Sequence, residues 1–266
     1  MRAWDPHSGR WQTPSSGPQD SAYLAVDSWL VDEGRVRGLE RHRARFVQAV
    51  QAAQTHDPID VQRFFDAAVA ALPRTGRWFP RVELSQGPVA AAGELRLTLR
   101  HAPTRLDEVV VFAHPYPDRR RAPRTKGPDL PRQLALRATV EAWDAGEALL
   151  ASPDGTVSEG IWTSPLWWDG DLLCALPRSA DVLDSVTRGL VLELAAQLGV
   201  EVGREAPSVA RLRDSETWLV SALHGIRLVT GWMITPGQAP EPAPAAPGRA
   251  AAWQARLEAL AVPLGG

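Results

Sequence analysis

Residues 124–130 read Arg124-Thr125-Lys126-Gly127-Pro128-Asp129-Leu130 and contain the only lysine in a chain of 266 residues. Arginine supplies the other 28 of the 29 lysine and arginine residues. An arginine stays protonated and forms no imine, whereas a primary amine condenses with an aldehyde and acts as a nucleophile or base. A compositional drift towards arginine would also leave a single lysine, so Lys126 alone keeps a purely structural alternative open.

The composition is that of an ordinary soluble globular protein, with 44% hydrophobic and 23% charged residues. A net charge of −2 argues against a globally basic nucleic-acid binder. The single Cys174 excludes an intramolecular disulfide and a multi-cysteine metal site, which fits a reducing cytoplasm. No apolar run has transmembrane length, so we expect no membrane segment. Residues 1–18 lack the apolar core of a signal peptide and are expected to form a flexible N-terminal arm.

The first part of the chain predicts a small α+β domain over residues 19–115. Apolar residues at helical spacing indicate a helix that begins near Leu39 and a second helix over about 58–72. Alternation with a period of two indicates strands around 22–33, 77–84 and 95–99, and the apolar run 109–112 suits a buried strand. The proline-rich and arginine-rich residues 116–128 are the expected interdomain linker.

Residues 129–266 predict a larger domain. Helices are expected over 130–143 and 186–198, the second of which ends before Gly199, a residue suited to the position after a helix. Short strands and hairpins are expected between these helices, and more strand over 217–229. Residues 235–248 are a Pro/Ala-rich linker that leads to a short final helix.

Five short motifs follow one another along the chain: His42–Phe46, Lys126 with Asp129-Leu130, Val157–Gly160, Leu183–Arg188 and Val220–Leu223. In this order they resemble H-x-x-R-L, K-x-x-N-L, the glutamate strand, L-P-G-I-T-R and the N-A-L or G-T-A stretch of the class IV aminotransferases, a pyridoxal phosphate-dependent family. The resemblance covers about residues 20–232. It implies the fold-type IV architecture, a small α+β domain followed by a larger pseudo-barrel domain that binds the cofactor.

The resemblance also implies which residues hold pyridoxal 5′-phosphate. Lys126 corresponds to the lysine that binds the cofactor aldehyde as an imine, and Glu159 to the glutamate at the pyridine nitrogen. Arg45, Val186 and Thr187 correspond to the phosphate-binding residues. These residue types suit the chemistry, because a phosphate favours a helix N-terminus, a hydroxyl and a planar guanidinium. A carboxylate beside the ring nitrogen favours its protonated form.

Further positions are expected on the cofactor and substrate sides of the site. Ser221 and Ala222 belong to the last motif and are expected to contact the cofactor. Trp162, His224 and Arg227 are expected to meet the substrate, Arg227 because strand alternation after Gly225 directs it to the same face. No histidine and carboxylate cluster has metal-ligand spacing, so no metal is expected.

Each residue has a structural alternative when it is considered alone. Glu159 suits a solvent-facing strand, Arg45 the solvated side of a helix, and Thr187 plain helix capping. Their order together with the sole lysine favours the functional interpretation. The sequence also departs from the family pattern, with Asp184-Ser185 in place of Pro-Gly, residues 161–165 in place of a small Asn-containing run, and no Gly-x-Phe-Glu around 25–29. An aspartate at position 184 would repel a phosphate unless it turns away.

The sequence therefore predicts a homodimeric, cytoplasmic pyridoxal phosphate enzyme that acts on amino acid-type substrates. The favoured activity resembles that of aminodeoxychorismate lyase, which releases pyruvate and 4-aminobenzoate. A transaminase of the branched-chain or D-amino acid type is the first alternative. A cofactor-binding homologue without catalysis is the second, because the segments 161–165 and 184–185 are altered. Neither a nucleic acid nor a membrane is an expected partner.

Overall fold

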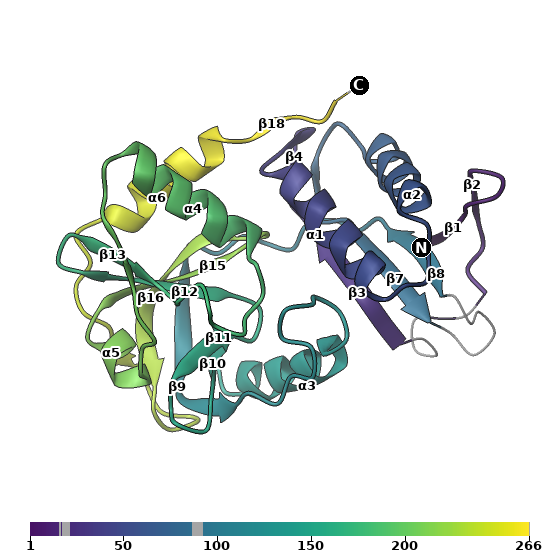
Figure 1. Cartoon of the computed structure of the whole chain (residues 1–266). Coiled ribbons are helices and arrows are strands. Elements are labelled where there is room, and N and C mark those ends of the chain that lie inside the picture. The colour runs from purple at the N-terminus through teal and green to yellow at the C-terminus, as the bar shows by residue number, and fades with distance from the viewer. Residues whose placement is uncertain (16, 18–21, 87–92, 266) are drawn as a thin grey trace. The chain divides into compact units, whose positions relative to one another are not determined.

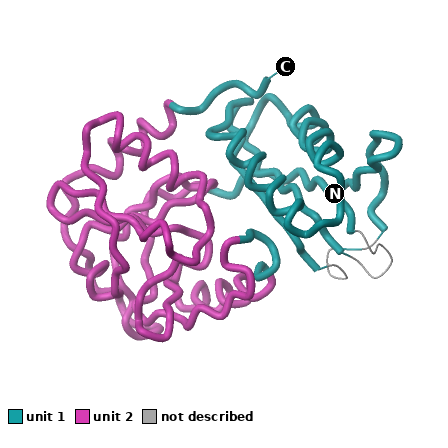
Figure 2. The backbone as a smooth tube through the Cα atoms, in the orientation of Figure 1, with its two compact units in different colours: residues 1–104, 125–130, 260–266 teal, residues 105–124, 131–259 magenta. Residues whose placement is uncertain are grey.

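The computed structural model describes residues 1–15, 17, 22–86 and 93–265. These residues divide into two compact units, which Figure 2 shows in different colours. Unit 1 contains residues 1–104, 125–130 and 260–266, and unit 2 contains residues 105–124 and 131–259. The mixture of helices and strands in Figure 1 confirms the predicted α+β class. No helix in the described ranges is long and apolar enough to cross a membrane.

Unit 1 is built on a five-stranded antiparallel sheet with the order β2-β1-β8-β7-β3. Its strands are β1 (Arg2–Asp5), β2 (Arg10–Gln12), β3 (Ala22–Ser28), β7 (Arg81–Gln86) and β8 (Glu94–Thr98). Helices α1 (Leu39–Ala52) and α2 (Pro58–Ala70) share one buried apolar cluster with these strands. Phe46, Phe64 and Phe65 supply the large side chains of that cluster.

The start of α2 follows from local sequence. Asp57 precedes the helix, and its carboxylate accepts a hydrogen bond of 2.8 Å from the backbone N–H of Ile59. Pro58 occupies the first helical position, where its fixed φ suits a helix and its missing N–H costs nothing. The two residues together end the preceding loop and begin the helix that the apolar spacing predicts.

A second, smaller sheet in unit 1 includes the last residues of the chain. Its order is β18-β5-β4-β6, from β4 (Val31–Asp32), β5 (Arg35–Val36), β6 (Arg77–Trp78) and β18 (Val262–Pro263). The backbone N–H of Leu264 donates to the carbonyl of Gly34 at 2.8 Å. The Leu264 side chain belongs to the buried cluster of unit 1.

The predicted N-terminal arm and domain boundaries differ from this organisation. Residues 16 and 18 of the arm lie outside the described residues, but β1 pairs with β2 and β8 in the sheet of unit 1. Aromatic packing holds β1 and β2 in place, because Trp4 and Trp11 contact each other at a centroid distance of 5.1 Å and both contact Phe64. The boundary expected at residue 115 falls at 104, and residues 125–130 and 260–266 return to unit 1.

Unit 2 contains a curled sheet of nine strands with the order β11-β10-β9-β16-β15-β12-β13-β14, and β17 pairs with β16. Strand β9 is parallel to β10 and β16, β13 is parallel to β14, and the other pairs are antiparallel. The strands are β9 (Glu108–Pro117), β10 (Glu147–Ala151), β11 (Val157–Gly160), β12 (Ser164–Asp169), β13 (Leu172–Ala175), β14 (Val202–Arg204), β15 (Glu216–Ser221), β16 (Gly225–Met233) and β17 (Glu241–Pro242).

The helices of unit 2 are α3 (Leu130–Glu141), α4 (Val186–Gln197), α5 (Val209–Arg213) and α6 (Arg249–Ala259). The predicted helices 130–143 and 186–198 match α3 and α4 within two residues at each end. The strand expected over 217–229 is a hairpin, because β15 and β16 pair on either side of residues 222–224. Helix α5 has only five residues and was too short for a helical period to indicate it.

Candidate functional site

Lys126 is held in unit 1 by its own backbone. The Lys126 carbonyl accepts a hydrogen bond of 2.7 Å from the backbone N–H of Val26, which lies in β3. The next residue, Gly127, has φ of +138°, and a Cβ there would lie 3.0 Å from the Val26 nitrogen. Glycine is therefore needed for this close approach of the two chain segments. The result is that the sole lysine is fixed beside the middle of β3.

Asp27, the residue after Val26, binds two side chains of α1. Its carboxylate accepts hydrogen bonds from Arg45 Nε at 2.8 Å and Arg45 Nη2 at 2.9 Å. The same carboxylate lies 2.7 Å from His42 Nδ1, which donates because a carboxylate only accepts. Asp27 and His42 are buried. The H-x-x-R motif of α1 is therefore oriented by an aspartate on the neighbouring strand.

The electrostatics of this cluster are dominated by burial and by Arg45. Burial opposes ionisation of Asp27, but the charges of Arg45 and His42 outweigh it and hold the pKa of Asp27 well below its usual range. Burial lowers the pKa of His42, Asp27 partly opposes this, and the positive charge of Lys126 lowers that pKa further. The structure thus brings together two residues predicted for the cofactor, Lys126 and Arg45, with His42 beside them.

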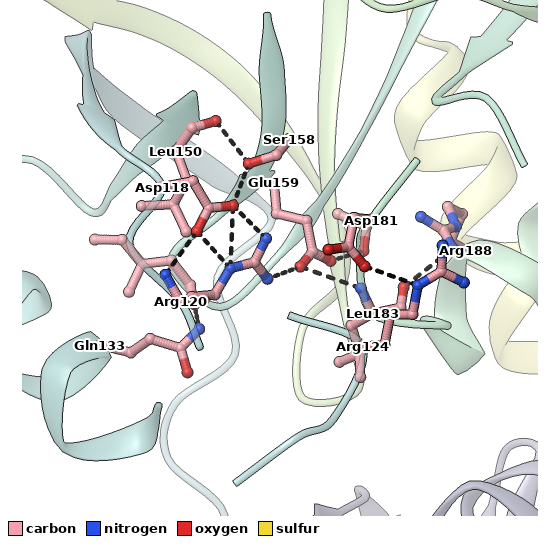
Figure 3. A network of polar contacts seen from close by, with 12 residues as sticks. Asp118, Arg120, Arg124, Gln133, Leu150, Ser158, Glu159, Asp181, Leu183 and Arg188 are labelled. Carbon is pink, nitrogen blue, oxygen red and sulfur yellow. Dashed lines mark hydrogen bonds and ion pairs between the residues drawn. The ribbon is translucent and has the colours of Figure 1, made fainter. Parts of the chain in front are cut away.

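Glu159 lies near the end of β11 in unit 2 and is only 4% exposed. Its carboxylate forms an ion pair with Arg120 and accepts hydrogen bonds of 3.3 Å from Ser164 Oγ and from the backbone N–H of Leu183. Figure 3 shows Arg120 between Glu159 and a second carboxylate, that of Asp118. Burial raises the pKa of Glu159, and the Arg120 charge and hydrogen bond counteract part of this effect. Glu159 is thus a buried, hydrogen-bonded acid and not a solvent-facing strand residue.

The start of α4 has the predicted form but a different capping residue. Ser185 is the N-cap, and its hydroxyl accepts a hydrogen bond of 3.3 Å from the backbone N–H of Arg188. Val186 and Thr187 occupy the first turn and are buried. Backbone N–H groups in a first turn have no acceptor within the helix and favour an anion. The Asp184 side chain is 99% exposed and its Oδ1 lies 3.8 Å from Arg188 Nη2, so its charge is solvated and faces a cation.

Glu159 and α4 are connected within unit 2. The backbone N–H of Leu183 donates to Glu159, and the carbonyl of the same residue accepts a hydrogen bond of 3.1 Å from Arg188 Nη2. The segment that leads into α4 is thereby tied to both the buried acid and the first turn of the helix. The predicted residues Glu159, Val186 and Thr187 thus belong to one connected part of unit 2.

Arg227 lies in β16 and is only 1% exposed. Its Nη2 is 3.4 Å from Glu147 Oε2 in a buried ion pair. The carboxylate of Glu147 also accepts backbone N–H bonds from Ala148 at 3.2 Å and from Ile161 at 3.0 Å. Glu147 therefore holds the loop that follows Glu159. The buried ion pair with Glu147 does not support a substrate contact through Arg227, which stays a prediction.

The remaining predicted residues lie around that loop and the β15–β16 turn. Trp162 is half-buried against an apolar cluster that includes Phe112. The Ser221 hydroxyl accepts a hydrogen bond of 3.2 Å from the backbone N–H of His224, across the turn that contains Ala222. His224 Nδ1 accepts a bond of 3.1 Å from the backbone N–H of Leu106, and burial lowers the pKa of His224 to about 3. The His224 ring is therefore neutral and has a structural partner.

Sequence reasoning missed four charged residues that position this site, namely Asp27, Asp118, Arg120 and Glu147. The short strands β4 and β5 and the start of α1 separate Asp27 from Arg45, and several strands separate Glu147 from Arg227, so no local spacing indicates either pair. One signal was present, because Asp27 is an acid inside the apolar stretch 22–31. No group of three or more histidine, cysteine or acidic residues with metal-ligand geometry occurs among the described residues.

Comparisons with known proteins agree with this geometry. The family model for amino-transferase class IV matches residues 24–232. A hypothetical aminotransferase from Mycobacterium tuberculosis, with α-ketoglutarate and PMP bound, is similar with a TM-score of 0.77 at 20% identity over 98% of each chain. A branched-chain aminotransferase from Thermoproteus uzoniensis with norvaline is similar with a TM-score of 0.79 at 13% identity, over 100% of this chain and 99% of the other.

A third solved structure is a putative 4-amino-4-deoxychorismate lyase from Legionella pneumophila, with a TM-score of 0.70 at 15% identity. The alignment covers 85% of this chain and 91% of that one. No curated protein matches the sequence. At these identities the solved structures establish the fold, which confirms the predicted fold-type IV architecture, and the family model covers most of the chain. The chain therefore belongs to the class IV aminotransferase family, as its motifs predict.

Proposed function

We propose that this chain is a pyridoxal phosphate-dependent enzyme that acts on an amino acid-type substrate with Lys126 as its catalytic base. Membership of the class IV aminotransferases makes the chain an enzyme, and pyridoxal phosphate is the cofactor of that family. The observation that carries the proposal is the position of Lys126. The backbone of the only lysine of the chain is hydrogen-bonded to Val26 in β3, and the next residue of that strand, Asp27, orients Arg45.

The residues present fit the chemical groups of the cofactor. Lys126 supplies the amine that an aldehyde requires, and Arg45 a guanidinium whose orientation is already set by Asp27. In unit 2, the first turn of α4 contributes N–H groups and the Thr187 hydroxyl for a phosphate. Asp184 does not oppose this role, because its carboxylate is exposed to solvent. Glu159 supplies a buried acid for a ring nitrogen.

The bound cofactor supplies an electron sink that stabilises negative charge at the Cα of the substrate. The protein residues then have separate tasks. Lys126 accepts the Cα proton through its amine. Glu159 holds a proton at the ring nitrogen by its negative charge. Arg45 in unit 1 and the first turn of α4 in unit 2 each supply groups that suit a phosphate.

Within this class, the favoured activity is lyase chemistry on aminodeoxychorismate. Support comes from the turn after β15, where Ser221-Ala222-Leu223 resembles the lyase motif and Ala222 has no hydroxyl. The turn is compact because the Ser221 hydroxyl accepts from the His224 N–H. Transamination is the alternative, since solved structures of similar fold include aminotransferases.

The test supplies purified enzyme and cofactor with aminodeoxychorismate and no keto acid. Lyase activity gives pyruvate, detected with lactate dehydrogenase, and an equal amount of 4-aminobenzoate over many turnovers. A transaminase gives no pyruvate there and instead consumes an amino acid only when a keto acid is added. If neither reaction occurs while the cofactor is bound, the chain is a binding homologue without catalysis. The predicted homodimer and cytoplasmic location stay predictions, and sedimentation of the holoenzyme checks the first.

A further inference from the structure

Arg120 lies between two carboxylates of unit 2. Its Nη2 is 2.6 Å from Asp118 Oδ2, and its Nε donates to Asp118 Oδ1 at 2.9 Å. Its Nη1 forms an ion pair with Glu159 Oε2. The side chains of Arg120 and Glu159 are each 6% exposed in this pair. One guanidinium is therefore shared by an acid at the end of β9 and the acid of β11 that is proposed to meet the cofactor ring (Figure 3).

Asp118 is itself fixed. The Ser158 hydroxyl donates to Asp118 Oδ2 at 2.7 Å and is also 3.2 Å from the carbonyl of Leu150. The backbone N–H of Arg120 donates to Asp118 Oδ1 at 3.1 Å. Burial opposes ionisation of Asp118, but the hydrogen bonds from Arg120 and Ser158 outweigh it and lower the pKa of Asp118. Asp118 is thus an anion that draws Arg120 into one orientation.

The charges of this group do not cancel. Two carboxylates face one guanidinium, so the three residues Asp118, Arg120 and Glu159 hold one negative charge in excess when all are ionised. Burial disfavours that excess charge, as the raised pKa of Glu159 indicates. Burial alone would lower the pKa of Arg120, but the Asp118 hydrogen bond and the Glu159 charge raise it, so Arg120 stays protonated. A cation that meets Glu159 would neutralise the group.

An ordinary structural salt bridge would look different. It would pair one acid with one base, and replacing both by apolar residues would cost little. Here the second acid makes no contribution to neutrality and instead leaves the buried group anionic. Glu159 also accepts hydrogen bonds from two neutral donors, Ser164 Oγ and the Leu183 N–H, and the positive charge of Arg188 counteracts part of the rise in its pKa.

We propose that Asp118 and Arg120 are positioning residues for Glu159. Arg120 keeps Glu159 ionised, and Asp118 leaves the three residues with one negative charge in excess, so that Glu159 favours a protonated ring nitrogen. The inference rests on the proposed role of Glu159 toward the cofactor ring. Without Arg120, Glu159 would take up a proton and become neutral. Without the Asp118 charge, Arg120 would fully neutralise Glu159. Loss of Arg120 thus removes the negative charge from Glu159 itself, whereas loss of the Asp118 charge leaves Glu159 and Arg120 as a neutral pair.

The experiment measures the affinity of the purified full chain for two probes by quenching of tryptophan fluorescence. One probe is pyridoxal phosphate, and the other is its analogue in which carbon replaces the ring nitrogen. The wild type is expected to bind pyridoxal phosphate about 10- to 100-fold more tightly than the analogue, the range of one charge-assisted hydrogen bond. Asp118→Asn and Arg120→Gln are each expected to reduce this ratio about tenfold, and Arg120→Lys to restore most of it. Arg119→Gln, an exposed neighbour in the same arginine run, should leave the ratio unchanged.

The ratio separates this inference from general damage, because both probes share the aldehyde and phosphate. If Arg120→Gln fails to fold, Asp118→Asn and Ser158→Ala carry the test, since Ser158→Ala removes only one hydrogen bond to Asp118. A wild-type ratio in Asp118→Asn, together with a reduced ratio in Glu159→Gln, overturns the inference and leaves the proposed function intact. If the wild type binds neither probe, or Glu159→Gln keeps the full ratio, the proposed role of Glu159 fails as well.

Discussion

The Asp27 carboxylate holds the Arg45 guanidinium by two hydrogen bonds, 2.8 Å from Nε to Oδ2 and 2.9 Å from Nη2 to Oδ1. Asp27 is fully buried, and the Arg45 side chain is 14% exposed. A paired guanidinium loses less conformational freedom when it meets a phosphate, because its orientation is already restricted. The family motif H-x-x-R on α1 therefore acts here together with an aspartate on β3.

Asp27→Asn is expected to lower the free energy of unfolding by about 3–5 kcal/mol, because it breaks the buried ion pair with Arg45 by removing one partner. Arg45→Met combined with Asp27→Asn should recover much of the loss. Urea denaturation of the apoprotein measures both. Asp66→Asn is the control, since Asp66 is 62% exposed in its ion pair with Arg43 and should change stability by less than about 1 kcal/mol. Equal effects of the two single changes would contradict the importance of the buried pair.

Lys126 is expected to be the site at which pyridoxal phosphate becomes covalently fixed by borohydride. It carries the only side-chain primary amine of the chain, and its backbone is anchored at Val26. Mass spectrometry of the digested protein should find the pyridoxyl group on the peptide that contains Lys126. Lys126→Arg serves as the matched control and should carry no label. Label confined to the N-terminal amine would exclude Lys126 from the chemistry.

Glu159→Gln is expected to reduce turnover by about 10²-fold or more, because the amide keeps the shape of the side chain and loses the charge that holds a proton on the ring nitrogen. Cofactor affinity should fall about tenfold, and thus less than turnover, since Arg45 and the first turn of α4 are unchanged. Arg45→Ala should show the reverse, with affinity lowered by about 1.5–3 kcal/mol through loss of a charge-assisted phosphate contact. Full activity of Glu159→Gln would show that this acid does not serve the ring.

His224 is expected to make stability depend on pH. Burial lowers its folded pKa to about 3, whereas an unfolded histidine has a pKa of about 6.5. Between these values the unfolded chain binds a proton that the folded chain does not. The contribution of His224 is therefore present above about pH 6.5 and is lost as the pH falls, by at most about 1.4 kcal/mol per pH unit.

Urea denaturation of the wild type and His224→Gln at several pH values checks this dependence. The advantage of the wild type should shrink steadily below about pH 6.5. His114→Gln is the control for loss of an exposed imidazole and should follow the pH dependence of the wild type. Parallel curves for the wild type and His224→Gln would mean that His224 titrates normally in the folded protein.

The C-terminal residues are expected to stabilise unit 1. Leu264 is 6% exposed within the core of that unit, and its backbone N–H donates to Gly34. Leu264→Ala should lower the free energy of unfolding by about 2–5 kcal/mol, the usual range for a buried leucine. Val262→Ala, at a residue 56% exposed, should have little effect. If thermal unfolding shows the same loss of stability in both variants, the C-terminal residues are not part of the core.

The sequence by itself determined the family and the order of the main elements. The sole amine at Lys126, the H-x-x-R spacing on a helix and the start of α4 are local features, because each depends on residues within a few positions of one another. Helices α3 and α4 could be predicted for the same reason, since their apolar residues recur at a helical period. These signals survive large changes elsewhere in the chain.

Only the tertiary structure decided which groups surround those residues. Arg45 meets Asp27, Glu159 meets Arg120, and Arg227 meets Glu147, and in each pair the two residues belong to different segments of the chain, so no period or motif indicates the pairs. The same holds for β1, which aromatic packing makes part of a sheet and not an arm. Burial then sets the charge states, because the pKa of a carboxyl or imidazole depends on how much water and which ions surround it in space. Local sequence indicates which chemical groups are present. The packing of segments that are distant in sequence determines the water and the charges around those groups.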